Sequence, residues 1–196
     1  MTTTLAINLP HALRVSDEQF LQFVQANPDL RLERAATGEL TLMAPTGSES
    51  GSYNFELGID LGNWNRQSKL GKAFDSSSGF RLPNGAIRSP DVAWVALERW
   101  NALPPDQRQG FAPLCPDFVV ELRSPTDDLA NLQAKMREYL DNGCKLGWLI
   151  DPQRRLVEIY CPGQAVESLP FSATLAGGSV LPGFALDLQS IFSEGE

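Results

Sequence analysis

The sequence predicts an α/β fold in which a mixed sheet is flanked by helices. Segments with helical apolar stripes alternate with short strand-like segments along the 196 residues. Residues 118–122, a following helix and residues 146–150 have the order expected of two strands joined by a helical crossover. The chain is 42% hydrophobic and 20% charged, which supplies enough apolar side chains for one compact domain over residues 1–196.

The N-terminal segment, up to residue 42, is expected to be an extension of a larger core. A capping box at Ser16 begins a helix that Pro28 ends. Residues 30–33 and 40–42 then alternate between apolar and polar side chains around a glycine-containing turn, which predicts a β-hairpin. The core itself is predicted to span residues 43–192.

The core is predicted to begin with a helix over residues 48–69, in which Tyr53 and Leu57 share an apolar face. The clearest helix of the chain covers residues 129–140, where Leu129, Leu132 and Met136 follow helical spacing, and Asn142-Gly143 supplies its end. Short strands are expected near residues 73–74, 80–82, 91–95, 118–122, 146–150 and 156–160, with tail strands near Glu167 and Val180 and a closing contact at Ile191-Phe192.

Charge and composition exclude several classes of protein. The net charge of −8 argues against a protein that coats nucleic acid or membrane through bulk charge, although residues 64–99 hold six basic residues and only three acidic ones. No apolar run is long enough to span a membrane, and the first residues do not resemble a secretory signal. Three cysteines without a CxxC pair predict neither a disulfide framework nor a zinc site. These features favour the cytoplasm and no membrane partner.

Hydrolases built on a nucleophile and a histidine base are disfavoured. The single histidine, His11, lies in an early loop with no motif around it. No GxGxxG or GK[ST] sequence is present, so neither a dinucleotide fingerprint nor a phosphate loop is predicted.

Carboxylates carry the strongest chemical signal. Glu121 lies inside an apolar strand and Asp91 at the entrance of another, where a charged side chain is costly unless something pairs with it or it binds a metal. Two acids on neighbouring strands would suit Mg²⁺ or Mn²⁺. Glu56, on the preceding helix, is a third candidate, and Lys135 lies at the margin of its helix's apolar stripe, from which its ammonium can approach Glu121.

Structural ion pairing is the alternative interpretation of these charges. Arg137 flanks the other side of the same helical stripe, so Lys135 and Arg137 are equally explained as a pair of surface side chains with buried stems.

Several motifs together resemble a known family. They are Met43-Ala44-Pro45-Thr46-Gly47, Ser89-Pro90-Asp91, the segment from Pro116 to Pro125 around Glu121, Lys135-Met136-Arg137-Glu138-Tyr139 and Trp148-Leu149-Ile150-Asp151-Pro152. The chain is similar, from about residue 40 to residue 191, to the Uma-type family of restriction-endonuclease-like proteins in the PD-(D/E)XK nuclease superfamily.

The resemblance implies a restriction-endonuclease-like αβββαβ core with additional C-terminal strands. It also implies that Asp91 and Glu121 bind a metal ion, with Glu56 at the helical acid position. One departure concerns the lysine of the superfamily's E-x-K motif, because Arg123 stands at that position, and Lys135 on the helix is expected to replace it. Arg123 cannot act as a base, but it can bind a phosphate, and Arg88 is a second candidate for substrate binding.

The predicted activity is Mg²⁺-dependent hydrolysis of phosphodiester bonds in DNA, with Mn²⁺ as a possible substitute. Asp91, Glu121 and the backbone carbonyl of Leu122 are expected to bind the ion, and Lys135 to orient water or stabilise developing charge. A homodimer is expected by analogy, since two-fold symmetry suits cleavage of both strands.

Two other classes of function stay open. A nuclease-fold protein that binds DNA or another protein without cutting fits the acidic net charge and the arginine at the E-x-K position. A sugar hydrolase with a pair of carboxylates would need no metal and would stay active in chelator.

Overall fold

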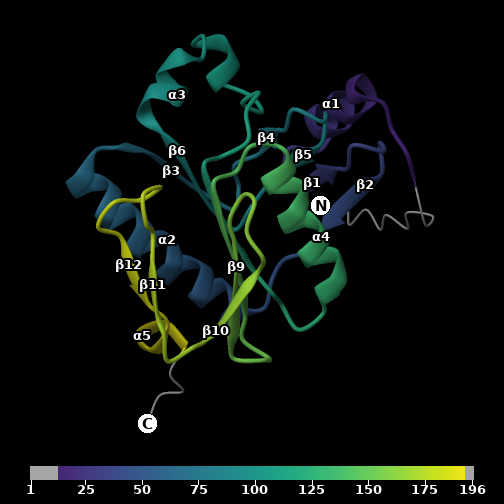
Figure 1. Cartoon of the computed structure of the whole chain (residues 1–196). Coiled ribbons are helices and arrows are strands. Elements are labelled where there is room, and N and C mark those ends of the chain that lie inside the picture. Colours follow the sequence, from purple (N-terminus) through teal and green to yellow (C-terminus); the bar gives the residue numbers. More distant parts are fainter. Residues whose placement is uncertain (1–12, 193–196) are drawn as a thin grey trace.

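The structure is a computed structural model, and it describes residues 13–192, so His11 lies outside the described residues. A six-stranded mixed sheet with strand order β10-β9-β8-β7-β6-β3 forms its centre. The strands are β3 (Gly71–Asp75), β6 (Val92–Ala96), β7 (Phe118–Leu122), β8 (Leu146–Asp151), β9 (Leu156–Tyr160) and β10 (Glu167–Pro170). Helices and smaller sheets cover its two faces (Figure 1), as the predicted α/β class requires.

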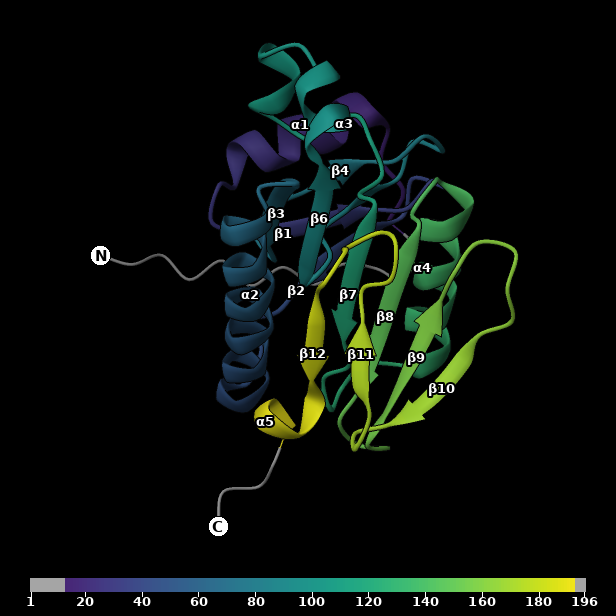
Figure 2. The same ribbon diagram turned by 60° about the vertical axis from the view of Figure 1, so that its left-hand side comes forward.

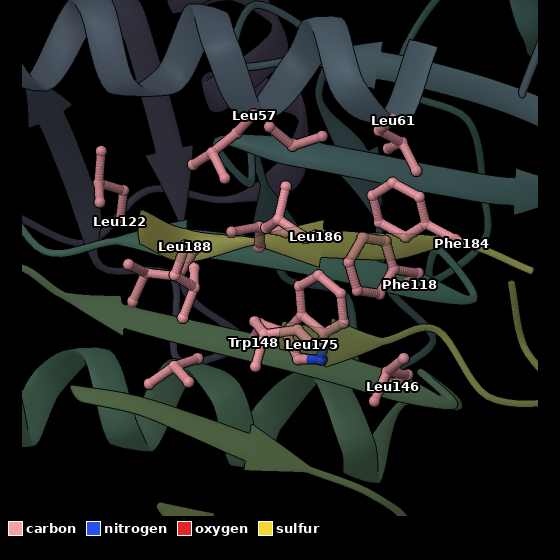
Figure 3. Close-up of a cluster of buried hydrophobic side chains, with 14 of the residues drawn as sticks. Leu57, Leu61, Phe118, Leu122, Leu146, Trp148, Leu175, Phe184, Leu186 and Leu188 are labelled. Atoms are coloured by element: carbon pink, nitrogen blue, oxygen red, sulfur yellow. The ribbon is translucent and has the colours of Figure 1, made fainter. Parts of the chain in front are cut away.

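One face of the sheet packs against helix α2 (Ser48–Ser68) and the C-terminal segment. That segment comprises the hairpin β11 (Thr174–Ala176) and β12 (Ala185–Asp187), followed by α5 (Leu188–Phe192). Figure 3 shows Leu57 and Leu61 of α2 above the aromatic side chains of Phe118 and Trp148, which are all buried. This apolar cluster holds α2 against the sheet and thereby fixes where its N-terminal half lies.

The opposite face packs against helix α4 (Leu129–Asp141), which lies behind the sheet in Figure 2. The chain runs from β7 through α4 into β8, and the two strands are parallel, so the predicted helical crossover is confirmed. Met136 and Tyr139 of α4 are fully buried on the sheet. Gly147 of β8 permits this close packing, because a Cβ at that position would come within 2.4 Å of the Met136 methyl group.

The N-terminal segment is more than an extension of the core. Helix α1 (Asp17–Ala26) begins with the predicted capping box at Ser16. The hairpin of β1 (Arg31–Arg34) and β2 (Leu40–Met43) joins a second sheet with strand order β2-β1-β5-β4. In this sheet β1 pairs with β5 (Ile87–Arg88), and β5 pairs with β4 (Phe80–Arg81). The hairpin is therefore hydrogen-bonded to the segment that leads into β6.

The remaining elements are the short helices α3 (Leu97–Ala102) and η1 (Asp106–Arg108). The prediction of a strand near Val180 is wrong, because Val180 lies in the turn between β11 and β12. Glycines on either side of it, at Gly178 and Gly183, have positive φ angles and favour a turn there. Phe192 is buried in the core as expected. No helix of residues 13–192 is long and apolar enough to cross a membrane.

Candidate active site

Asp91 and Glu121 meet where β6 begins and β7 ends. The two strands are antiparallel with Val92 opposite Val120, so Asp91, which directly precedes β6, lies near Glu121 of β7, and its charge acts on that residue. The backbone N–H of Leu122 donates a hydrogen bond to Oδ2 of Asp91 over 2.8 Å. Strand pairing and this hydrogen bond together hold the two carboxylates next to each other.

Lys135 of α4 reaches the same point. Its Nζ lies 2.8 Å from Oε1 of Glu121, the proximity that its position on the helix predicted. The hydroxyl of Tyr139, one turn further along α4, donates to the same Oε1 atom over 2.9 Å. Arg137 is exposed, whereas the Lys135 side chain is only 12% exposed, so the two do not form the symmetric surface pair that was the alternative interpretation.

Glu33 is a fourth charged residue at this point, and the sequence did not indicate it. It lies in β1 and is only 4% exposed. Its Oε1 is 2.9 Å from Nζ of Lys135 and accepts the backbone N–H of Ser89 over 2.7 Å. Its Oε2 accepts a hydrogen bond from Arg88 over 3.2 Å. Pairing of β1 with β5 thus brings an acid of the hairpin to the lysine of α4.

Asn54, rather than Glu56, is the α2 residue that contacts these acids. Its Nδ2 donates to Oδ1 of Asp91 over 3.1 Å. The Oδ1 atom of Asn54 is buried and has no hydrogen-bond partner in residues 13–192. Glu56 is exposed on α2, and the group on which its charge acts is Asp60. The structure therefore does not bring Glu56 to Asp91 or Glu121.

The other predicted site residues lie nearby but already have protein partners. Leu122 contacts Asp91 through its N–H, not through the carbonyl that was expected to bind a metal. Arg123 pairs with Asp151 over 2.9 Å, and Arg88 pairs through Nε with Glu138 over 2.6 Å as well as with Glu33. The sequence could not show these pairings, because each joins residues that lie far apart in the chain.

The basic stretch of residues 64–99 is also partly neutralised. Arg81 pairs with Asp17, Arg99 pairs with Asp117, and Arg88 pairs as described above. Half of the six basic residues in this stretch are therefore engaged by carboxylates.

The pKa values of the three acids shift in different directions, although burial acts to raise each of them. Desolvation, followed by repulsion from Asp91 and Glu33, raises the pKa of Glu121 to about 7 despite the opposing effect of Lys135. Desolvation also raises the pKa of Asp91, although the Leu122 N–H and Lys135 oppose it. For Glu33 desolvation is again the largest effect, but Lys135, Arg88 and the Ser89 N–H outweigh it, so its pKa is lowered. The Lys135 side chain is largely shielded from water, which favours its neutral form. The carboxylates of Glu121 and Glu33 outweigh this effect, raise the pKa of Lys135 and keep it charged.

The cluster is short of positive charge. When all its acids are ionised, four carboxylates face two cations; the carboxylates are those of Glu33, Asp91, Glu121 and Glu138, and the cations are Lys135 and Arg88. No group of three or more His, Cys, Asp or Glu side chains in residues 13–192 is arranged to hold a metal ion.

Comparisons with known proteins identify the family. The Uma2 family, described as a putative restriction endonuclease, matches residues 17–189. The chain belongs to the Uma2 family. It is also similar to a solved structure from Anabaena variabilis ATCC 29413, described as a putative nuclease belonging to DUF820. That likeness has a TM-score of 0.71 and 20% sequence identity, and it covers 83% of this chain and 89% of the other. None of the curated proteins matches.

Membership of the Uma2 family supports a nuclease-type function, and the likeness to the Anabaena structure shows that the two chains share a fold. Restriction-endonuclease-like proteins generally use divalent metal ions. The family match covers β1 and α4 as well as β6 and β7, so all the residues of the cluster lie within it.

Proposed function

We propose that this Uma2 protein is a metal-dependent endonuclease that hydrolyses phosphodiester bonds in DNA. The observation that carries the proposal is the contact of Lys135 with Glu121, next to Asp91, at the adjoining ends of two central strands. A buried lysine and two acids of raised pKa form an arrangement suited to catalysis, and such shifts concentrate at functional sites.

The residues present fit a divalent cation. Asp91 and Glu121 supply carboxylate oxygens, and burial, the largest effect on each, raises the pKa of both, so a bound cation would offset the cost of ionising the pair. The buried Oδ1 atom of Asn54 has no partner in the part of the chain that the structure describes, so it is a neutral oxygen available as a further ligand. Mg²⁺, with Mn²⁺ as a substitute, prefers such oxygen donors and commonly keeps several waters. When bound, the ion would lower the pKa of a coordinated water and stabilise charge on the scissile phosphate.

The protein side chains have separate parts in this proposal. Asp91 and Glu121 would bind the ion, and the hydroxyl of Tyr139 fixes the carboxylate of Glu121 by donating to Oε1. Lys135 stays protonated and therefore provides a fixed positive charge beside the reacting phosphate, rather than a base. Arg123 and Arg88 contribute to substrate binding only if DNA competes with their carboxylate partners. A homodimer would place two such sites on the two strands of a duplex.

The test is a plasmid-nicking assay in Mg²⁺ and Mn²⁺ with one matched pair of variants. Glu121→Gln removes a metal-binding charge and should abolish nicking. Glu158→Gln is the control, because Glu158 is nearly as buried as Glu121. Glu121 of β7 and Glu158 of β9 each pair with Leu149 of β8, so the two glutamates lie on the same face of the sheet. Equal cleavage by the Glu121 variant and the parent chain would refute the assignment, as would full activity of the parent chain in chelator.

A binding module without catalysis is the second candidate function. The guanidinium groups of Arg88 and Arg123 are already paired with carboxylates. Half of the basic residues in residues 64–99 are likewise paired, so few unpaired cations are left in this stretch to hold a phosphate for cleavage. Binding of Mn²⁺ by calorimetry, without hydrolysis of single- or double-stranded DNA, would favour this second function.

A further inference from the structure

We propose that Glu33, which lies outside the αβββαβ core, is a positioning residue of the catalytic centre that fixes both Lys135 and the segment leading into Asp91. The proposal rests on the proposed function, since it assigns Glu33 a part in that reaction. It makes the N-terminal hairpin a component of the active site instead of an addition to the fold.

The contacts of Glu33 show why it positions other groups and does not bind metal itself. Both of its carboxylate oxygens are occupied: Oε1 faces Nζ of Lys135 and the Ser89 N–H, and Oε2 faces Arg88. The Glu33 side chain is only 5% exposed, so its carboxylate makes little contact with solvent. Its carboxylate is thus fully used in holding protein groups.

The first of these groups is the ammonium of Lys135. It lies between Glu33 at 2.9 Å and Glu121 at 2.8 Å. A lysine side chain has several rotatable bonds, and a single carboxylate partner would leave its direction poorly defined. Two partners on different strands, β1 and β7, fix the ammonium at one place over the end of the central sheet.

The second group is the backbone before Asp91. The Ser89 N–H donates to Glu33 two residues before Asp91, and Pro90, between them, restricts the backbone further. The carboxylate of Glu33 therefore fixes both the backbone just before Asp91 and the position of the Lys135 ammonium. Arg88, which bridges Glu33 and Glu138 of α4, ties this arrangement to the helix that carries Lys135.

Glu33→Gln tests the inference because the amide keeps the shape of the side chain and loses its charge. Supporting partners of this kind typically contribute about 10–100-fold in activity. We expect kcat to fall by about that factor, with the KM for DNA nearly unchanged. The control is Glu39→Gln, which removes the same charge from an exposed position of the same hairpin and should leave kcat unaltered.

A double-mutant cycle separates positioning from general structural support. Because Glu33 acts in part through Lys135, Glu33→Gln should cause a smaller fold loss of kcat in a Lys135→Met background than in the parent chain. Losses that multiply independently would overturn the proposal.

A second measurement needs neither catalysis nor metal. The chain has four lysines, so the ¹⁵N signals of their ammonium groups can be resolved and assigned in labelled apo protein. The ammonium protons of Lys135 should exchange slowly with water in the parent chain and faster in Glu33→Gln, with no change in Glu39→Gln. An unaltered Lys135 signal would overturn the inference even if the parent chain cleaves DNA. A parent chain that cleaves nothing would instead refute the proposed function, and the Lys135 signal would still decide whether Glu33 holds the lysine.

Discussion

Asn54 donates a hydrogen bond to Asp91 over 3.1 Å, and this contact joins α2 to the start of β6. The Oδ1 atom of the same Asn54 amide is buried and has no hydrogen-bond partner among residues 13–192, which costs free energy unless a ligand satisfies it. Asn54→Ala should therefore weaken Mn²⁺ binding, measured by calorimetry, by about 10-fold, the lower end of the range for groups that support metal sites.

Glu56→Ala is the matched control for that prediction, since Glu56 lies on the same helix and is exposed. It should leave the Kd for Mn²⁺ within error of the parent value. A loss of Mn²⁺ affinity in Glu56→Ala, with none in Asn54→Ala, would show that Glu56 is the metal-binding residue of α2, as the sequence predicts.

The pKa of Glu121 predicts a specific pH dependence of stability. An ordinary glutamate has a pKa of 4.5, whereas burial and the neighbouring acids raise that of Glu121 to about 7. Between these values the folded chain holds a proton that the unfolded chain has lost, so this residue makes the free energy of unfolding fall as pH rises through the interval. Above pH 7 the folded chain bears the full free-energy cost of an ionised, buried Glu121.

Glu121→Gln removes this penalty. In chelator at pH 8 the variant should be more stable than the parent chain by on the order of 2 kcal/mol, and the difference should shrink toward pH 4.5. Urea unfolding at pH 5 and pH 8 measures it. Glu158→Gln should show no such gain at pH 8, and a Glu121 variant destabilised at both pH values would contradict the raised pKa.

The sequence predicted those parts of the fold and site that depend on local patterns. Asp91 and Glu121 stand out because apolar strands rarely carry unpaired acids, and Lys135 follows from the phase of its helix. Asn54 has no charge to mark it, so the sequence favours the nearby Glu56 instead. Glu33 lies in a segment whose alternation predicts a hairpin but does not indicate which residues cover its polar side chains.

Pairings between distant segments account for what the sequence did not reveal. Glu33 is buried because β1 pairs with β5, which brings Arg88 to its carboxylate, a contact between residues more than 50 positions apart. The same holds for Arg88 and Arg123, which were expected to bind substrate. Their charge is visible in the sequence, but the carboxylates that engage them are not.

Arg123 is expected to affect stability more than substrate binding. Its guanidinium pairs with Asp151, whose side chain is 1% exposed, and donates to the backbone carbonyl of Asp127. Arg123→Met should lower the free energy of unfolding by roughly 1–3 kcal/mol, because it removes a partner of a buried carboxylate. Arg137→Met, at an exposed position of α4, should have little effect. If Arg123→Met instead weakens DNA binding at unchanged stability, the phosphate-binding role expected from the sequence is correct.

Lys135→Met separates turnover from metal binding. The substitution removes a cation from beside Glu121, so Mn²⁺ should bind at least as tightly as in the parent chain. DNA nicking should nevertheless fall by about 100-fold or more, since a charge placed to stabilise the transition state is lost. The variant leaves Glu33 and Glu121 without their shared cation and should unfold more readily in chelator than in Mn²⁺. Loss of Mn²⁺ binding with nicking retained in high Mn²⁺ would show instead that Lys135 only organises the metal ligands.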